Sequence, residues 1–157
     1  YSPEAKLTRA QFLVMTMRAY GIGPDEKWND SFADAGNGYY SGYLAAAKRL
    51  GITKGKGSNL YAPDNEITRQ EMFTLLYNTL KLMGELPGGK SGKPLTAFSD
   101  ADIIATWAKD AMTLFAATGI IEGSGGRLNP AETVNRAQMA QVLYNLLSGG
   151  VLEQAIE

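Results

Sequence analysis

Pro63-Asp-Asn-Glu-Ile-Thr-Arg-Gln-Glu-Met72 is one of three versions of the same segment in this chain. The other two are Pro3-Glu-Ala-Lys-Leu-Thr-Arg-Ala-Gln-Phe12 and Pro130-Ala-Glu-Thr-Val-Asn-Arg-Ala-Gln-Met139. A segment that recurs at nearly constant spacing indicates a fold built from repeated structural units.

Each copy of this segment predicts the start of a helix. A residue that favours the N-cap position precedes the shared arginine, as Thr8, Thr68 and Asn135. Three positions later stand Gln11, Glu71 and Gln138, each of which completes a capping box. Apolar residues then follow at helical spacing, such as Met72, Leu76 and Leu80. Glycines that can end the helices come after these stripes, as Gly21, Gly84 and Gly149.

A second segment occurs twice and predicts a further helix before each of the last two helix starts. It runs from Phe32-Ala-Asp34 through Tyr39-Tyr40 to Gly51-Ile52, and again from Phe98-Ser-Asp100 through Trp107-Ala108 to Gly119-Ile120. Glycine-rich turns then lead to the proline segments, with Gly55 and Gly57 in one copy and Gly123 and Gly125 in the other.

The order of these segments predicts an all-α chain with three units in one compact module. The second half of a first unit covers residues 1–21, a second unit covers 30–84, and a third covers 97–149. The missing front half of the first unit, together with Tyr1 in place of an initiator methionine, indicates a piece of a longer protein.

The composition narrows the possible functions. The 157 residues carry 15 basic and 16 acidic side chains, so no net positive charge favours nucleic acid or a membrane surface. The sequence has no Cys and no His, which excludes disulfides, thiol nucleophiles and the commonest general base and metal ligand. No apolar run is long enough to span a membrane. We expect no cofactor and no metal, and any anion recognition must be local.

Two motif matches do not indicate a site. Gly84-Glu-Leu-Pro-Gly-Gly-Lys90-Ser91 fits the phosphate-loop pattern, but that motif needs a strand before it and a helix after it. We interpret this stretch as part of a flexible linker between units. The run that starts at Asp34 has Ala45 at the position where an EF-hand needs a glutamate.

The three arginines are the strongest functional signal. Arg9, Arg69 and Arg136 occupy the first helical turn, where the helix dipole disfavours a cation by roughly 0.3–1 kcal/mol. This unfavourable choice, made three times, indicates a role outside folding. Free amides at a helix start attract anions, and a neighbouring guanidinium suits a carboxylate or phosphate. The alternative is that each arginine pairs with a structural acid, such as Asp34 or Asp100.

Further candidate ligand-binding residues surround the helix starts. They are Thr8, Thr68, Asn135, Asp34, Asp100, Tyr39, Tyr40, Trp107, Gly55, Gly57, Gly123 and Gly125. Aromatic faces stack on sugar rings, and glycines let a ligand approach backbone amides. As alternatives, the two aspartates cap turns or accept hydrogen bonds from loop amides, and Tyr39 and Trp107 are core residues at helix starts.

The combined pattern resembles the S-layer homology repeat over residues 5–147. Leu7-Thr-Arg-Ala-Gln11 and Ile67-Thr-Arg-Gln-Glu71 are similar to the family's helix-start motif, and Phe98-Ser-Asp100 with Trp107-Ala108 is similar to its opening. The chain departs from the family pattern at Asn135, where threonine is usual, and at Tyr39, where tryptophan is commoner.

The resemblance implies a pseudo-threefold helical bundle, with a central three-helix spindle surrounded by helix-loop-helix prongs. It also implies a secreted, non-catalytic module at the cell wall or S-layer of Gram-positive and related bacteria. Grooves between repeats would bind secondary cell-wall polysaccharide, attached to peptidoglycan, through a pyruvylated sugar whose carboxylate meets the motif arginine.

Two other functions compete with this expectation. A helical scaffold for protein–protein contact, including self-association into a layer, predicts exposed apolar patches and arginines buried in structural pairs. A carboxylate-based hydrolase requires two carboxyl groups that face each other in one cleft.

Overall fold

The computed structural model describes the backbone of residues 2–156 and the side chains of residues 2–148. This part of the chain forms five α-helices and three short 3-10 helices, with isolated β-bridges but no strand. The α-helices are α1 (Arg9–Ala19), α2 (Ser41–Leu50), α3 (Arg69–Met83), α4 (Lys109–Ala117) and α5 (Arg136–Ile156). The expected all-α class is therefore confirmed. None of the described helices has the length and apolar character that a membrane crossing requires.

The three predicted helix starts are confirmed, each with its capping box. Thr8 accepts a hydrogen bond from the N–H of Gln11, and Thr68 accepts one from the N–H of Glu71. In α5 the Gln138 N–H donates to Asn135 Oδ1 (2.8 Å), and the Asn135 N–H donates to the Gln138 side chain (2.9 Å). These bonds satisfy amides that a helix start otherwise leaves unpaired.

The helix ends agree with the sequence in part. Gly84 ends α3 in the left-handed conformation, with φ of 71°. Gly21 also has positive φ, one residue after the cap of α1. The prediction that Gly149 ends the last helix is wrong, because α5 continues to Ile156. The residues after Gly149 include Leu152, Glu153, Gln154 and Ala155, which favour helix strongly enough to carry it past one glycine.

A closed ring of backbone hydrogen bonds joins the three helix starts. The N–H of Leu7 donates to the carbonyl of Val134 (3.0 Å), Val134 donates to Ile67 (3.1 Å), and Ile67 donates back to Leu7 (2.9 Å). All three side chains are fully buried, so water does not compete for these bonds. The helices α1, α3 and α5 therefore begin next to one another.

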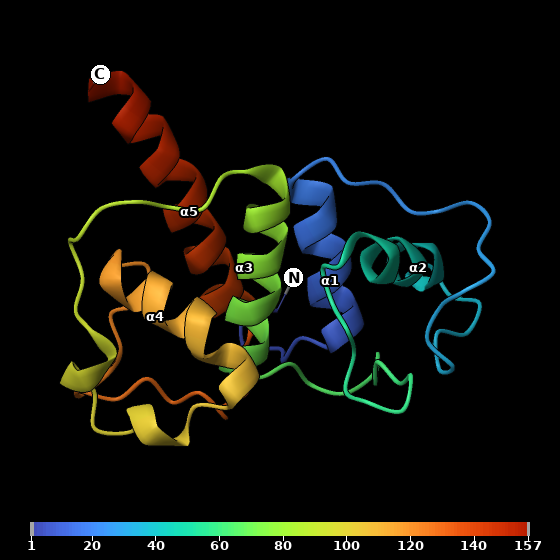
Figure 1. Ribbon diagram of the computed structural model, residues 1–157, viewed down its shortest axis with the longest axis horizontal. Coiled ribbons are helices and arrows are strands. Elements are labelled where there is room, and N and C mark those ends of the chain that lie inside the picture. Colours follow the sequence, from blue (N-terminus) through green and yellow to red (C-terminus); the bar gives the residue numbers. More distant parts are fainter. Residues whose placement is uncertain (1, 157) are drawn as a thin grey trace.

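The other two helices lie on the outside of this group. In Figure 1, α2 packs on the α1 side of the molecule and α4 packs on the α3 side. Aromatic rings connect the layers, since the ring centres of Phe73 in α3 and Phe115 in α4 are 5.6 Å apart. One buried core thus runs through all the units.

The segment between the second and third units is held against α4. The Ser91 hydroxyl donates to the Thr118 carbonyl (2.8 Å), and the N–H groups of Gly92 and Lys93 donate to Ala117 (3.0 Å) and Ala116 (2.9 Å). These carbonyls lie at the C-terminal end of α4 and its cap residue, where helix carbonyls lack partners within the helix. The expectation of a flexible linker is therefore wrong for residues 91–93.

Candidate functional site

A groove of about 540 Å³ lies between residues 51–56 and one face of α3, and we call it the first groove. Arg9 of α1 and Trp107 of the 3-10 helix Thr106–Ala108 also line it. The first groove therefore takes residues from each of the three units that the sequence predicted.

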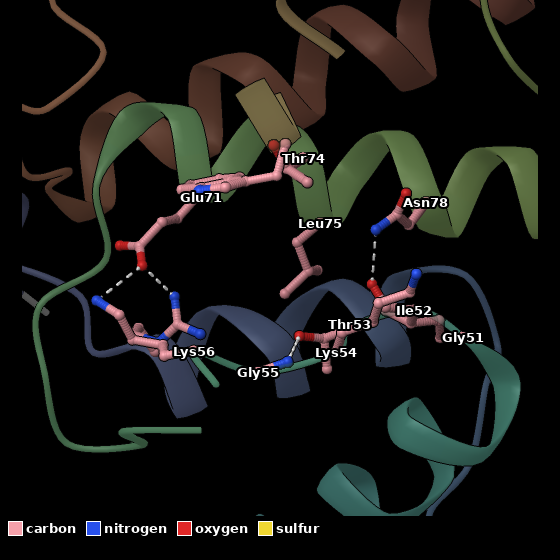
Figure 2. Close-up of a pocket in the computed structure, with 12 residues that line it drawn as sticks. Gly51, Ile52, Thr53, Lys54, Gly55, Lys56, Glu71, Thr74, Leu75 and Asn78 are labelled. Carbon is pink, nitrogen blue, oxygen red and sulfur yellow. Dashed lines mark hydrogen bonds and ion pairs between the residues drawn. The ribbon is translucent and has the colours of Figure 1, made fainter. Parts of the chain in front are cut away.

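The loop that forms one wall is fixed in place by its own residues and by α3. Asn78 of α3 donates to the carbonyl of Ile52 (3.0 Å), and Thr53 accepts from the N–H of Gly55 (3.1 Å) (Figure 2). Gly55 has φ of 77°, and a Cβ there would lie 2.4 Å from the Leu60 carbonyl oxygen. No other residue type fits this position without moving the backbone.

A network of charges forms one part of the first groove. Arg9 is 5% exposed and makes an ion pair with Glu71, while its Nε donates to the carbonyl of Tyr61 (2.8 Å). The guanidinium carbon also lies 4.4 Å from the centre of the Tyr61 ring. Lys56 reaches the same carboxylate from the solvent side, at 3.4 Å (Figure 2). The Arg9 charge is therefore largely neutralised within the protein.

The alternative that the arginine pairs with an acid is correct for Arg9, but the expected partners were wrong. Asp34 accepts hydrogen bonds from the N–H groups of Tyr61 (2.9 Å) and Ala62 (2.8 Å). Asp100 accepts from Leu128 and Asn129, both at 2.8 Å. The two aspartates thus hold the loops before the proline segments, as their structural alternative predicted.

The helix-start amides are not available to a ligand, which corrects one part of the anion-site prediction. The N–H of Arg9 donates to the backbone carbonyl of Asn65. In the same way, the N–H of Arg69 donates to the carbonyl of Glu132, and the N–H of Arg136 donates to the carbonyl of Ala5. The next amide in each helix donates to the first proline carbonyl of a neighbouring segment: Pro63, Pro130 or Pro3. Thr8, Thr68 and Asn135 are also engaged, in their capping boxes. Adjacent units are therefore joined through the helix-start amides, whereas the capping side chains bond within their own helix.

Arg69 and Arg136 differ from Arg9 because neither forms an ion pair with any described residue. Both are half-buried, and Arg69 donates through Nε to the Leu128 carbonyl (2.9 Å). This bond corresponds to the one between Arg9 and Tyr61. Burial lowers the pKa of Arg69 from its ordinary value, although Glu132 and Asp100 act against that shift. The repeated arginine therefore has a structural role at two of its three positions.

Tyr39 and Trp107 are exposed, so the alternative that these two are core residues is wrong, whereas Tyr40 is half-buried against the core. Trp107 is 57% exposed and Tyr39 is 61% exposed. Gln70 of α3 accepts a hydrogen bond from the N–H of Ala105 (2.9 Å), which fixes the chain two residues before Trp107. Tyr39 and Tyr40 meet edge to face, with ring centres 5.3 Å apart, and they do not line the first groove.

Of the fifteen candidate residues, the first groove brings together Arg9, Gly55 and Trp107. Sequence reasoning missed the lysines of the groove, Lys54 and Lys56, which flank Gly55 in the glycine-rich turn. It also assigned Glu71 to helix capping alone. A search for charged residues beside the loop glycines would have found Lys54 and Lys56, but it would not have found Glu71. No group of three or more acidic side chains in the described part of the chain is placed to bind a metal ion.

The fold and the first groove define a class of protein: a helical repeat module with a groove between its predicted units. The S-layer homology domain matches residues 31–73 and 97–140, which is more than half of the chain. The chain therefore belongs to the S-layer homology domain family. Domains of this family anchor S-layer and other cell-surface proteins to the cell wall, so we assign the chain to the secreted, wall-associated proteins.

Individual relatives agree with this family. An exoglucanase from Acetivibrio thermocellus is 32% identical over 94% of this chain and 13% of its own length. The S-layer protein Sap of Bacillus anthracis is 31% identical over 91% of this chain and 17% of its own. An amylopullulanase from Thermoanaerobacterium thermosulfurigenes is 32% identical over 94% of this chain and 8% of its own length. The chain thus spans less than a fifth of the length of each of these relatives.

Proposed function

We propose that this chain anchors its parent protein by binding the carboxylate of a pyruvylated secondary cell-wall polysaccharide in the first groove. The observation that carries the proposal is the combination of an exposed tryptophan and two exposed lysines around one groove. Trp107 offers a face on which a sugar ring can stack. Lys54 and Lys56 offer positive charge for a carboxylate, in a chain whose net charge is −1.

The same proposal includes a pseudo-threefold arrangement, in which α1, α3 and α5 form the spindle and α2 and α4 belong to the prongs. The ring of hydrogen bonds among Leu7, Ile67 and Val134 supports it, because each unit donates to one neighbour and accepts from the other. Proposed unit boundaries at 1–21, 30–84 and 97–149 follow from the same symmetry. Tyr1 lies outside the described residues.

Sedimentation with purified cell walls tests the anchoring role. The chain is expected to co-sediment with intact walls and to stay in solution after the secondary polysaccharide has been removed from them. Unchanged binding to the stripped walls would mean that the chain recognises peptidoglycan or protein instead.

The charge network in the first groove also bears on the hydrolase alternative. Glu71 is the one carboxylate among the residues that line the first groove, and Arg9 and Lys56 both lie against it. A glycosidase of the usual kind needs a second carboxyl group across the cleft. This lining therefore supports binding without hydrolysis.

Self-association is a second candidate function, and one observation favours it. Tyr144 and Leu147 on α5 are 66% and 49% exposed, whereas the corresponding Met17 of α1 and Leu80 of α3 are buried. Contact between copies through this face predicts concentration-dependent association that Tyr144→Glu abolishes. Sedimentation velocity checks it, and a chain that stays monomeric at high concentration would exclude it.

A further inference from the structure

The chain contains two related loops, at residues 51–60 and 119–127, that differ in charge. Gly55 and Gly123 both have φ of 77°, and a Cβ on either would collide with a phenylalanine ring, that of Phe32 or that of Phe98. The following N–H donates across the turn in each loop, from Lys56 to Leu60 (2.7 Å) and from Ser124 to Arg127 (2.9 Å). The two loops therefore have equivalent positions from Gly51 to Lys56 and from Gly119 to Ser124, although the turn that follows is one residue longer in the first loop.

The side chains on these frames differ in charge. Lys54 and Lys56 of the loop at 51–56 correspond to Glu122 and Ser124 of the loop at 119–124. The groove residue Glu71 likewise corresponds to Gln138. The first groove thus combines three cations with one carboxylate, whereas the equivalent positions beside the second loop offer Arg69 and Glu122, whose charges cancel.

Within the first groove, the lysines are the cations that a ligand can reach. Arg9 is buried and already bound to Glu71 and to the Tyr61 carbonyl. Lys56 is half exposed, and Lys54 is exposed and forms no ion pair with the described residues. A carboxylate that enters the groove therefore meets ammonium groups before it meets the guanidinium.

We propose that Lys54 and Lys56 determine where this chain binds its anionic ligand, and that they take the direct role which the sequence assigns to the motif arginine. The ligand then occupies the first groove in preference to the equivalent surface beside Glu122. This inference rests on the proposed function, since it names the groups that would contact the carboxylate of that ligand. Its strongest competitor is Arg69, a half-buried guanidinium without an acidic partner among the described residues.

The test uses a methyl hexoside that carries a 4,6-linked pyruvate ketal, with its methyl ester as the uncharged control ligand. Calorimetric titration compares the natural chain with three variants. Lys54→Glu/Lys56→Ser gives the first loop the charges of the second. Lys90→Glu/Lys93→Ser makes the same change in net charge at exposed positions outside the groove. Arg69→Gln removes the competing cation.

We expect the natural chain to prefer the acid over the ester, and the first variant to bind the acid at least about tenfold more weakly. The other two variants should bind within about twofold of the natural chain. If the natural chain does not distinguish acid from ester, recognition of a carboxylate fails, and the proposed function and this inference are both overturned. If it distinguishes them but the loss occurs in Arg69→Gln and not in the lysine variant, this inference alone is overturned.

Discussion

At the scale of single residues, the position of Arg9 explains why a cation stands where a helix dipole disfavours it. The side chain leaves its own helix, pairs with Glu71 of α3 and binds the carbonyl before the next proline segment. These contacts join the first unit to the second. They also outweigh a dipole penalty of about 1 kcal/mol or less.

This role predicts different costs for removing two equivalent arginines. Arg9→Gln is expected to lower the free energy of unfolding by about 3 kcal/mol, because it leaves the buried Glu71 carboxylate without its closest partner. Arg69→Gln should cost about 1 kcal/mol, because it loses one hydrogen bond to a carbonyl. Urea denaturation measures both. Equal losses would show that the ion pair between Arg9 and Glu71 adds nothing to the free energy of unfolding beyond the hydrogen bond that both arginines make.

A second prediction concerns Asp100 and acid. Burial disfavours the charged form of this carboxyl, but hydrogen bonds from Leu128 and Asn129 outweigh burial and hold its pKa below the ordinary value. The folded chain then binds the proton less tightly than the unfolded chain does. The stability from this group is complete above about pH 4 and is lost as the pH falls through the lowered pKa.

Asp100→Asn should therefore flatten the acid side of the stability profile. We expect the natural chain to be the more stable of the two at neutral pH, and the difference to shrink on acidification. Thermal unfolding at a series of pH values measures this difference. Parallel profiles from neutral to acidic pH would contradict the assignment.

The sequence was informative about residues whose role is local and less so about those whose role is tertiary. The capping pairs follow from spacing alone, because the two partners are three residues apart. The ion pair of Arg9 with Glu71 joins residues 62 positions apart, so no spacing rule predicts it. The exposure of Trp107 depends on how its short helix packs against α3, and the local sequence does not predict that packing either.

At the scale of elements, the segment between the second and third units is better defined than its composition suggests. Its glycines and lysines are typical of a flexible linker. Three hydrogen bonds nevertheless connect residues 91–93 to the end of α4. The carbonyls at the end of α4 accept these bonds, and no sequence pattern predicts that this helix end lies next to Gly92.

Substitution of two glycines in this segment tests that contact. A Cβ at Gly92 would lie 1.8 Å from the Ala116 carbonyl oxygen, whereas nothing lies within 4 Å of the same atom at Gly88. Gly92→Ala is expected to lower the free energy of unfolding by about 2 kcal/mol, as overpacking does. Gly88→Ala is the matched control and should leave stability unchanged. Chemical denaturation measures both, and a neutral Gly92→Ala would mean that the segment does not dock.

At the scale of the whole molecule, the hydrogen-bonded ring makes the units depend on one another. Leu7, Ile67 and Val134 come from three distant parts of the sequence, and each supplies a donor and an acceptor. Opening any one segment breaks two bonds of the ring. The repeat pattern predicted the units, but the closure of the ring is visible only in three dimensions.

This interdependence predicts a common protection against hydrogen exchange. The amides of Leu7, Ile67 and Val134 should exchange with similar opening free energies, close to that of global unfolding. Native-state exchange followed by NMR measures the three values. Early exchange at Leu7 and Val134 with late exchange at Ile67 would show that the outer segments open independently.

The proposed anchoring requires that the wall polysaccharide binds in the first groove and on no other face. Titration of the purified polysaccharide into isotopically labelled protein, followed by NMR, locates the bound surface residue by residue. We expect the resonances of the Trp107 indole and of the Thr53 and Gly55 amides to shift together, while those around Tyr144 stay in place. Shifts confined to α5, or none near Trp107, would contradict it.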